Sequence, residues 1–388
     1  MAQASGSSAG KSFFGRFGVH IAVLFFVAIW TIPTLGILVS SLRDKDQIIA
    51  SGWWNSFFSS TQTENARLPA PNTAVEKGGK FVLEGSLFET PGNRKITAFG
   101  TRAVAPTEFP AGSAADLGDG ETLQINEDGG FVMSYPVAQT DERGRRVYFA
   151  ATVPPRFTTE NYETVLFSEG IGRSFLNSLT VTVPATIIPI MIAAFAAYAL
   201  AWMRFPGRAL LIATVIGLLV VPLQMALIPL LELYNGVGNL FGVPSKTYLG
   251  IWLAHTGFGL PFAIYLLRSY MAGLPRELME SARIDGASDF EIFIKIVLPL
   301  SFPVLASFAI FQFLWVWNDL LVAMVFLGSG ADQLVLTGKL NALLGSRGGD
   351  WEILTTSAFI TIIVPLIVFF SLQRYFVRGL LAGSVKGG

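Results

Sequence analysis

The sequence contains no cysteine, and this absence excludes disulfides, thiolate metal centres and cysteine nucleophiles. Histidine is scarce too, because His20 and His255 are the two present and lie far apart in sequence, which argues against a histidine metal site. Only 14% of the residues are charged, against about a quarter in soluble domains. The formal net charge is zero, so nothing in the composition favours a nucleic-acid partner.

Signatures of catalysis are also missing. Neither an H-E-x-x-H nor a G-x-S-x-G pattern occurs within the long apolar runs of the chain. Gly10-Lys11-Ser12 resembles the end of a phosphate-binding loop, but Ser5 stands where the first glycine of that motif is needed, and no strand precedes it. We therefore predict a protein that is not an enzyme and binds neither a metal nor a cofactor directly.

Long apolar runs are what the chain has in abundance. About 20 apolar residues suffice to cross a bilayer, and six runs are free of charge or nearly so, the fifth being interrupted by Asp319. The predicted fold is an all-α polytopic membrane protein with six transmembrane helices. The runs are 19–42, 174–203, 209–231, 247–267, 302–327 and 353–373.

Most of the charge falls in one segment, 43–170, which predicts a soluble insertion after the first helix. Short β-branched and aromatic stretches beginning near Phe81, Lys95, Thr122, Phe131 and Arg146 alternate with Gly, Pro, Asn and Asp. We expect a small β-rich domain over about 75–155, with loops at 59–74 and 111–119. Two interpretations stay open: a structural cap without a site of its own, or a docking surface for a partner.

Lysine and arginine are distributed unevenly between the loops, and this bias predicts orientation. With the N-terminus inside, the inner segments carry eleven basic residues and the two short outer loops carry three. We expect cytoplasmic tails at 1–18 and 374–388, an extracytoplasmic insertion, and a five-helix core over 171–373. The inner residues are Lys11, Arg16, Arg204, Arg208, Arg268, Arg276, Arg283, Lys295, Arg374, Arg378 and Lys386, and the outer ones are Lys246, Lys339 and Arg347.

Polar side chains inside the predicted spans are candidates for a transport path, because such groups are costly in the bilayer and usually face a cavity or another helix. An indole face beside polar groups suits a sugar, which stacks its CH groups and hydrogen-bonds its hydroxyls. The alternative is that the tryptophans belong to the interfacial aromatic belt and that Asp319 caps a helix break. The candidates are His255, Gln312, Trp315, Trp317, Asn318 and Asp319.

A polar segment at 275–303 interrupts the apolar core and is predicted to form two short helices. Pro275 suits a first helical turn, and Gly286 can adopt a positive φ where the chain turns. Apolar residues then follow at helical spacing, which predicts one buried face on the second helix. That face comprises Phe290, Phe293, Ile294 and Val297.

The same segment resembles the EAA loop of permease subunits of bacterial ABC importers. The family pattern is matched by Glu280, Ser281, Ala282, Asp285, Gly286, Ala287, Phe293, Ile296, Pro299 and Pro303, with Ser281 in place of the first alanine. The resemblance extends from about Phe157 to the C-terminus. It is strongest to the MalG-like carbohydrate permeases, and the large insertion is similar to that of the alpha-glucoside subgroup.

This resemblance implies a type I ABC importer permease in the bacterial inner membrane, forming half of a translocation pore for a sugar. It implies a second, MalF-like permease subunit, two copies of an ATP-binding subunit that hold ATP and Mg²⁺, and an extracytoplasmic sugar-binding protein. The matched loop residues from Glu280 to Phe293 would form the coupling helix that contacts the ATPase. The tail residues expected to insert between the ATP-binding subunits are Gly383, Ser384, Val385 and Lys386.

Two other classes of protein remain as alternatives on the residues alone. A secondary transporter would use Asp319 or Glu232 as an ion-coupling acid, and a membrane-anchored assembly protein would need only the β cap. The lack of charge pairs inside the spans argues against the first, and the loop pattern argues against both.

Overall fold

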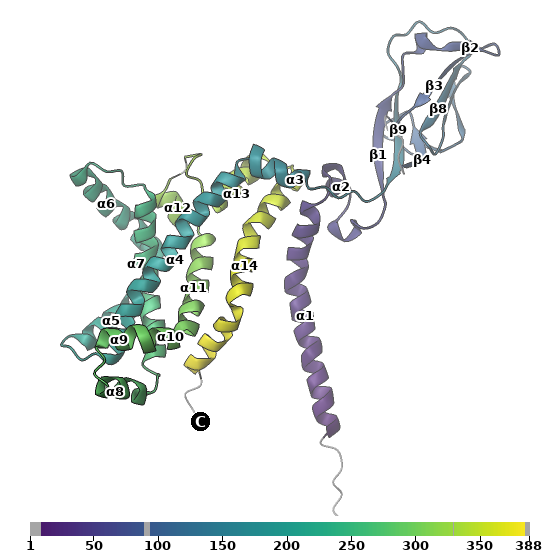
Figure 1. Cartoon of the computed structure of the whole chain (residues 1–388). Helices are drawn as coiled ribbons and strands as arrows, with labels where there is room; N and C mark the ends of the chain where they lie inside the picture. Colours follow the sequence, from purple (N-terminus) through teal and green to yellow (C-terminus); the bar gives the residue numbers. More distant parts are fainter. Residues whose placement is uncertain (1–8, 89–93, 329, 385–388) are drawn as a thin grey trace, which may run out of the picture. The chain divides into compact units, whose positions relative to one another are not determined.

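The computed structural model describes residues 9–88, 94–328 and 330–384 of the chain (Figure 1). They form two compact units, Met1–Thr159 and Glu160–Gly388, each of which is described by itself.

The first unit begins with a long apolar helix, which is followed by a short helix and a 3₁₀ turn. Helix α1 spans Ala9–Ser41, and its apolar part, Phe17–Ser41, is long enough to cross a membrane. Helix α2 spans Lys45–Ala50 and is capped by Asp44, whose side chain accepts a hydrogen bond from the Asp46 backbone N–H. A single 3₁₀ turn, η1, follows at Trp53–Asn55.

The described residues that follow in this unit form nine antiparallel strands in two sheets. One sheet has the order β1-β9-β4-β5 and the other β2-β3-β8-β7-β6. Buried side chains of both sheets, among them Phe99, Phe149, Leu123 and Met133, share one hydrophobic core. The strands are β1 Ser60–Arg67, β2 Val75–Lys77, β3 Lys80–Ser86, β4 Lys95–Gly100, β5 Phe109–Pro110, β6 Ala114–Gly118, β7 Glu121–Ile125, β8 Gly130–Tyr135 and β9 Arg146–Val153, with a 3₁₀ turn, η2, at Pro71–Thr73.

The sequence prediction of loops at 59–74 and 111–119 is wrong. Strand β1 lies in the first range and pairs with β9 over its whole length, from Ser60 opposite Val153 to Arg67 opposite Arg146. Strand β6 lies in the second range and pairs with β7. Both are edge strands made mostly of polar or small residues. They are held in place by backbone pairing with a more apolar neighbouring strand, and their own sequences lack the alternation of apolar and polar residues that predicts a strand.

The insertion enters and leaves at one point. The Thr158 backbone N–H donates to the Leu42 carbonyl at 2.7 Å, next to a β-bridge between Arg43 and Phe157. The buried Arg43 guanidinium donates to the Gln47 and Ser51 carbonyls at the end of α2. The base of the insertion is therefore fixed to the end of α1.

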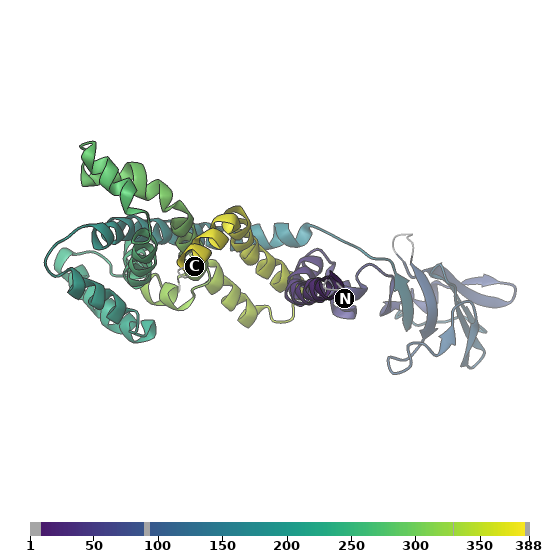
Figure 2. The same cartoon turned by 90° about the horizontal axis from the view of Figure 1, so that it is seen from below.

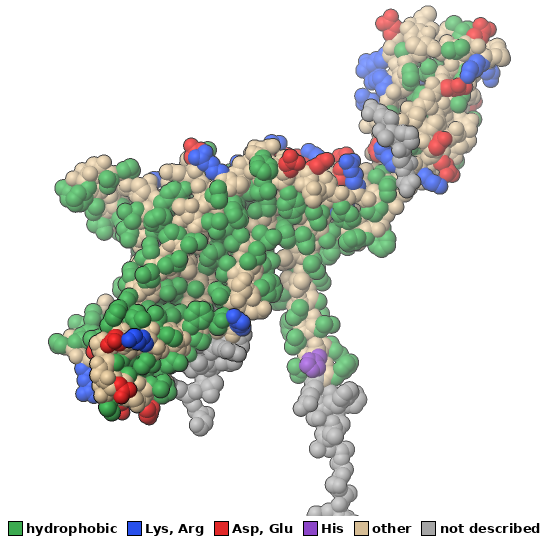
Figure 3. All heavy atoms as spheres, in the orientation of Figure 1, with side chains coloured by type: hydrophobic (Ala, Val, Ile, Leu, Met, Phe, Trp, Pro, Cys, Tyr) green, Lys and Arg blue, Asp and Glu red, His purple; other side chains and the backbone are tan. Residues whose placement is uncertain are grey.

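The second unit is helical. Its elements are α3 Glu160–Glu163, the π-helical η3 Thr164–Ser168, α4 Ile171–Trp202, α5 Arg208–Leu218, α6 Leu223–Phe241, α7 Tyr248–Met271, α8 Arg276–Ile284, α9 Asp289–Ile292, the π-helical η4 Phe293–Val297, α10 Leu298–Leu300, α11 Phe302–Trp317, α12 Leu321–Phe326, α13 Leu336–Ser346 and α14 Trp351–Ser384. Helices α4, α7, α11 and α14 pack against one another (Figures 1 and 2). Hydrophobic side chains cover the middle of this unit and charged ones gather at its two ends (Figure 3).

Four of the described helices are long and apolar enough to span a membrane singly: α1, α4, α7 and α14. The count rises to six if each of two bent helix pairs is one span. The predicted third span, 209–231, is therefore not one straight helix: α5 and α6 meet at 107°. The bend falls at Pro222, which cannot donate to a continuing helix and disfavours helical backbone at Val221 before it.

Candidate functional site

The segment at 275–303 folds as two short helices joined at Gly286, as predicted. Gly286 has φ +87°, and its backbone N–H donates to the Arg283 carbonyl at 3.1 Å. The next N–H, of Ala287, donates back to Ala282 at 2.9 Å, so the carbonyls at the end of α8 are satisfied. Helix α9 opens with a capping box between Ser288 and Glu291. We call the segment Pro275–Ser301 the hairpin.

Apolar side chains anchor the hairpin in the helical bundle. Met279, Ile292, Phe293 and Val297 are each no more than 2% exposed and belong to one core with residues of α4 and α7. The Phe293 ring lies 4.7 Å from that of Phe195 and 5.2 Å from that of Tyr198, both on α4. Movement of the hairpin would therefore displace α4.

The predicted apolar face of the second helix is partly wrong. Phe293 and Val297 are buried as expected, but Phe290 is 63% exposed and Ile294 37% exposed, while Ile292 is buried. The helix packs with Ile292, Phe293 and Val297 toward the core shared with α4 and α7, so its buried face is rotated toward Ile292 and away from Phe290.

The predicted coupling residues fall into two groups: most lie at or near the surface of the hairpin, and one is buried in the bundle. Phe293 lies in the core. Two exposed apolar side chains that were not predicted lie on the same helix, α8: Ile284 is 86% exposed and Leu278 is 43% exposed. Seen from below, α8 stands out from the spanning helices (Figure 2). Of the predicted set, Glu280, Ser281, Asp285 and Gly286 are exposed, and Ala282 and Ala287 are half-buried.

A polar contact that was not predicted also links the hairpin to the bundle. The Asp289 carboxylate accepts from the Arg283 guanidinium at 3.1 Å and from the Tyr198 hydroxyl at 3.4 Å. Tyr198 lies within the part of the chain, from about Phe157 onward, that resembles the carbohydrate permeases, but no local pattern in the sequence pairs it with Asp289.

The candidate path residues lie around α11, but their environments differ. Trp317 is 2% exposed: its indole N–H donates to the Thr361 carbonyl and its ring stacks on Phe313 with centroids 5.6 Å apart. The buried Gln312 amide donates to the carbonyls of Ala185 and His255. These groups join α4, α7, α11 and α14, and they are engaged in packing.

Trp315 is the candidate with the most open ring, at 40% exposed, and it meets the buried His255 edge-on at 6.4 Å. Asn318 and Asp319 lie just beyond α11, because that helix ends at Trp317. The Asn318 amide donates to the Leu314 carbonyl, and an Asp319 carboxylate oxygen accepts the Val322 backbone N–H at 2.9 Å. Asp319 therefore caps the break between α11 and α12, as the alternative interpretation expected.

Truncation of Trp317 to alanine is expected to destabilise the helical unit strongly. The change leaves a large cavity and removes a buried donor from the Thr361 carbonyl, which costs about 3–5 kcal/mol. Trp315→Ala is the matched control and should cost less than half as much, because that ring is already partly exposed. Thermal unfolding of the two variants in the same detergent measures the difference, and equal losses would contradict this assignment.

The predicted tail contacts fall at the end of the described chain. Gly383 and Ser384 belong to α14, so the helix continues beyond the expected boundary at 374. Val385 and Lys386 lie outside the described residues.

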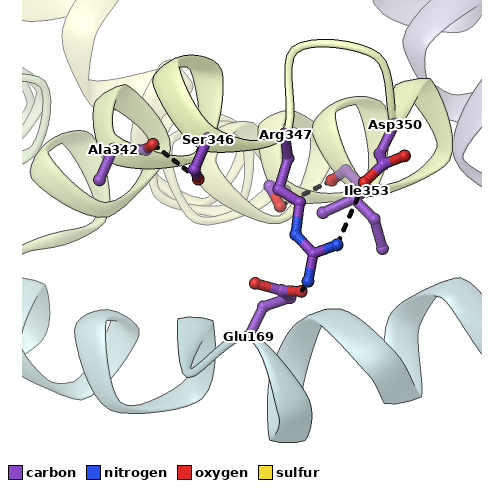
Figure 4. Close-up of polar contacts among 7 residues, drawn as sticks. Glu169, Ala342, Ser346, Arg347, Asp350 and Ile353 are labelled. Atoms are coloured by element: carbon purple, nitrogen blue, oxygen red, sulfur yellow. Dashed lines mark hydrogen bonds and ion pairs between the residues drawn. The ribbon is translucent and has the colours of Figure 1, made fainter.

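At the opposite end of the unit from the hairpin, hydrogen bonds hold α4 to later segments. The Asn177 amide donates to the carbonyls of Asp332 and Leu334, and its oxygen accepts from the Tyr248 hydroxyl at 2.9 Å. Arg347 bridges Glu169 at 2.8 Å and Asp350 at 3.3 Å (Figure 4). Asn177 lies within the range from about Phe157 onward that resembles the permeases, but nothing in the sequence pairs Arg347 with Glu169.

The family described as binding-protein-dependent transport system inner membrane component matches residues 174–381. The chain is 68% identical over 370 residues to the alpha-glucoside transport system permease protein AglG of Rhizobium meliloti, covering 95% of this chain and 97% of that protein. It is 44% identical over 374 residues to the osmoprotective compounds uptake permease protein GgtD of a Synechocystis species, covering 96% and 93%.

Among solved structures, the chain is similar to part of a bacterial ABC transporter involved in the import of the acidic polysaccharide alginate. The two share 24% identity with a TM-score of 0.49, over 58% of this chain and 82% of the other.

Proposed function

This chain belongs to the family of binding-protein-dependent transport system inner membrane components, and we propose that it forms half of the pore of an ATP-driven importer of alpha-glucosides or similar short oligosaccharides. As a member of this family it is a membrane permease subunit and not an enzyme. Alpha-glucosides are proposed as the substrate because the chain is 68% identical to an alpha-glucoside permease, and the match extends over the insertion as well as the core.

The coupling assignment is supported by the hairpin itself. An exposed apolar tip at Ile284, a glycine turn and a root packed on α4 make a short rigid lever. Seated in a groove on an ATP-binding subunit, such a lever passes the closure of the ATPase dimer to the pore helices. ATP and Mg²⁺ then belong to those partners, and two copies of them serve this chain and a second permease subunit.

Six spans and cytoplasmic termini follow if each bent helix pair crosses the membrane once. The basic residues then lie mainly inside, and the β-sheet insertion lies outside, where an extracytoplasmic sugar-binding protein delivers the ligand. Trp315 offers the most open ring for a sugar to stack on, with His255 beside it. This arrangement places the energy input and the sugar path at different levels of the helical unit.

The test is reconstitution of the complete importer. The tagged chain is purified in mild detergent, the copurifying subunits are identified, and ATP hydrolysis and uptake are measured with a panel of alpha-glucosides. Stimulation by at least one alpha-glucoside supports the proposal. A purified complex that responds only to osmoprotective compounds other than sugars would replace this substrate class with the one named for the Synechocystis relative.

Two substitutions at Asp319 separate a cap from a ligand contact. Because its carboxylate accepts the Val322 N–H, Asp319→Asn should keep the cap and leave uptake within about twofold, since asparagine caps as well as aspartate. Asp319→Ala removes the cap and should destabilise the unit by about 0.5–2 kcal/mol. Melting temperature and uptake are measured for both, and a large loss of uptake in the asparagine variant would show that the charge itself is needed.

A further inference from the structure

The first unit contains a pocket, lined by both polar and apolar groups, that no part of the transport mechanism above uses. It has a volume of about 1020 Å³ and lies between α2, strand β1 and the segment that leaves β9. Small-molecule sites usually occupy about 300–1,000 Å³. The pocket is therefore large enough for a ligand of disaccharide or trisaccharide size.

The wall formed by α2 is held in place by one buried side chain. The Gln47 amide donates to the Pro154 carbonyl at 2.8 Å, and its oxygen accepts the Arg156 backbone N–H at 3.0 Å. The Arg43 guanidinium holds the far end of α2 through the Ser51 carbonyl and hydroxyl. A ligand would meet preformed walls, so binding would cost little ordering of the protein.

The lining offers both donors and acceptors. Glu64 pairs with Arg94, whose guanidinium also lies 4.7 Å over the Phe88 ring. Gln62 lies on the same face of β1 as Glu64. Among the described residues, Gln62 Nε2 and Arg94 Nε are shielded and have no hydrogen-bond partner, and an unmet buried donor favours any ligand or rotation that supplies an acceptor. The Asp46 carboxylate lines the α2 side.

This combination favours one class of ligand. An inorganic anion is disfavoured because three carboxylates line the pocket against two guanidinium groups. A metal ion is disfavoured because no group of three His, Cys, Asp or Glu residues in the described parts of the chain could hold one. A polyol fits, since each hydroxyl both donates and accepts, and carboxylates, amides and guanidinium groups serve both needs.

We propose that this pocket binds a neutral saccharide through its hydroxyl groups, as a site on the permease outside the pore. The inference rests on the proposed function, which makes a sugar the ligand and places the insertion on the side from which the sugar arrives. The ligand would then contact this chain before it enters the pore.

The test uses the full chain alone in lipid nanodiscs, with binding of trehalose, sucrose and maltose measured by titration calorimetry. At least one of these sugars should bind. Glu64→Gln and Asp46→Asn should each raise its Kd about tenfold, the effect of losing one hydrogen bond to a charged group. Glu84→Gln, on β3 outside the pocket, is the matched control and should leave Kd unchanged. Circular dichroism shows whether each variant keeps its sheets.

The outcomes separate this proposal from the proposed function. If the complete importer takes up one of the sugars but the chain alone binds none, or binds it equally in both pocket variants, the pocket proposal is wrong and the function stands. If the variants weaken only the association of the sugar-binding protein, the pocket is a protein-docking site and the proposal is again wrong. Uptake of no sugar, with binding lost in Glu64→Gln, would keep the pocket and overturn the function.

Discussion

Replacing Ile284 with aspartate is expected to abolish ATP-driven uptake while leaving the chain folded in the membrane. Ile284 ends α8, and 86% of its surface is exposed although the side chain is fully apolar. Burying an isoleucine in a partner groove contributes about 1.5–3 kcal/mol, and forcing an unpaired carboxylate into the same groove costs considerably more. The affinity of the hairpin for the ATP-binding subunit should fall by about 100-fold or more.

The measurement is copurification of the ATP-binding subunit together with sugar-stimulated ATP hydrolysis and uptake. Ile284→Leu is the matched control, because it keeps apolar volume at the tip and should retain both activities. The fold should survive in the aspartate variant since no neighbouring core residue depends on Ile284. Normal uptake by Ile284→Asp would show that the tip of α8 does not enter the ATPase.

The hairpin shows how far a local pattern reaches. Its two helices and the turn at Gly286 were predictable, because proline, glycine and polar residues act over a few neighbouring positions. Which apolar residues face outward was not predictable. Packing on α4 and α7 sets the buried face, so that Phe290 is exposed and Ile292 is buried. Ile284 was missed because an isolated isoleucine has the same sequence signal in a core as on a docking surface.

Elsewhere the limit is set by long-range pairing. Five strands of the insertion were predicted from their own apolar residues, whereas β1 exists because Ser60–Arg67 pairs with β9, more than 70 residues later in the sequence. The same holds for the candidate path. Trp315 and Trp317 are two positions apart and have similar sequence surroundings. The Trp315 ring is nevertheless partly exposed, whereas the Trp317 ring is buried against Phe313 and donates to the Thr361 carbonyl. Only the packing of α11 on α14 distinguishes them.

Substituting Gly286 by valine is expected to stop transport without preventing membrane insertion. Space is not the obstacle, since a Cβ at this position would meet no atom within 4 Å. The obstacle is the backbone: at φ +87° a residue with a side chain is strained, by about 1–2 kcal/mol, and a β-branched residue more so. The turn would relax toward negative φ and break the Ala287-to-Ala282 hydrogen bond, which swings α8 away from its position relative to the anchored Phe293.

Asparagine at the same position provides the matched control. Asn is the residue other than glycine that best tolerates left-handed backbone, so Gly286→Asn should keep the hairpin geometry and most of the uptake. Both variants add a side chain to an exposed site, so a difference between them reports the backbone requirement rather than bulk. Uptake, ATP hydrolysis and copurification are compared in the reconstituted importer. Equal loss in the two variants would mean that the glycine is needed for close approach of the partner, and equal retention would mean that the hairpin does not act as a rigid lever.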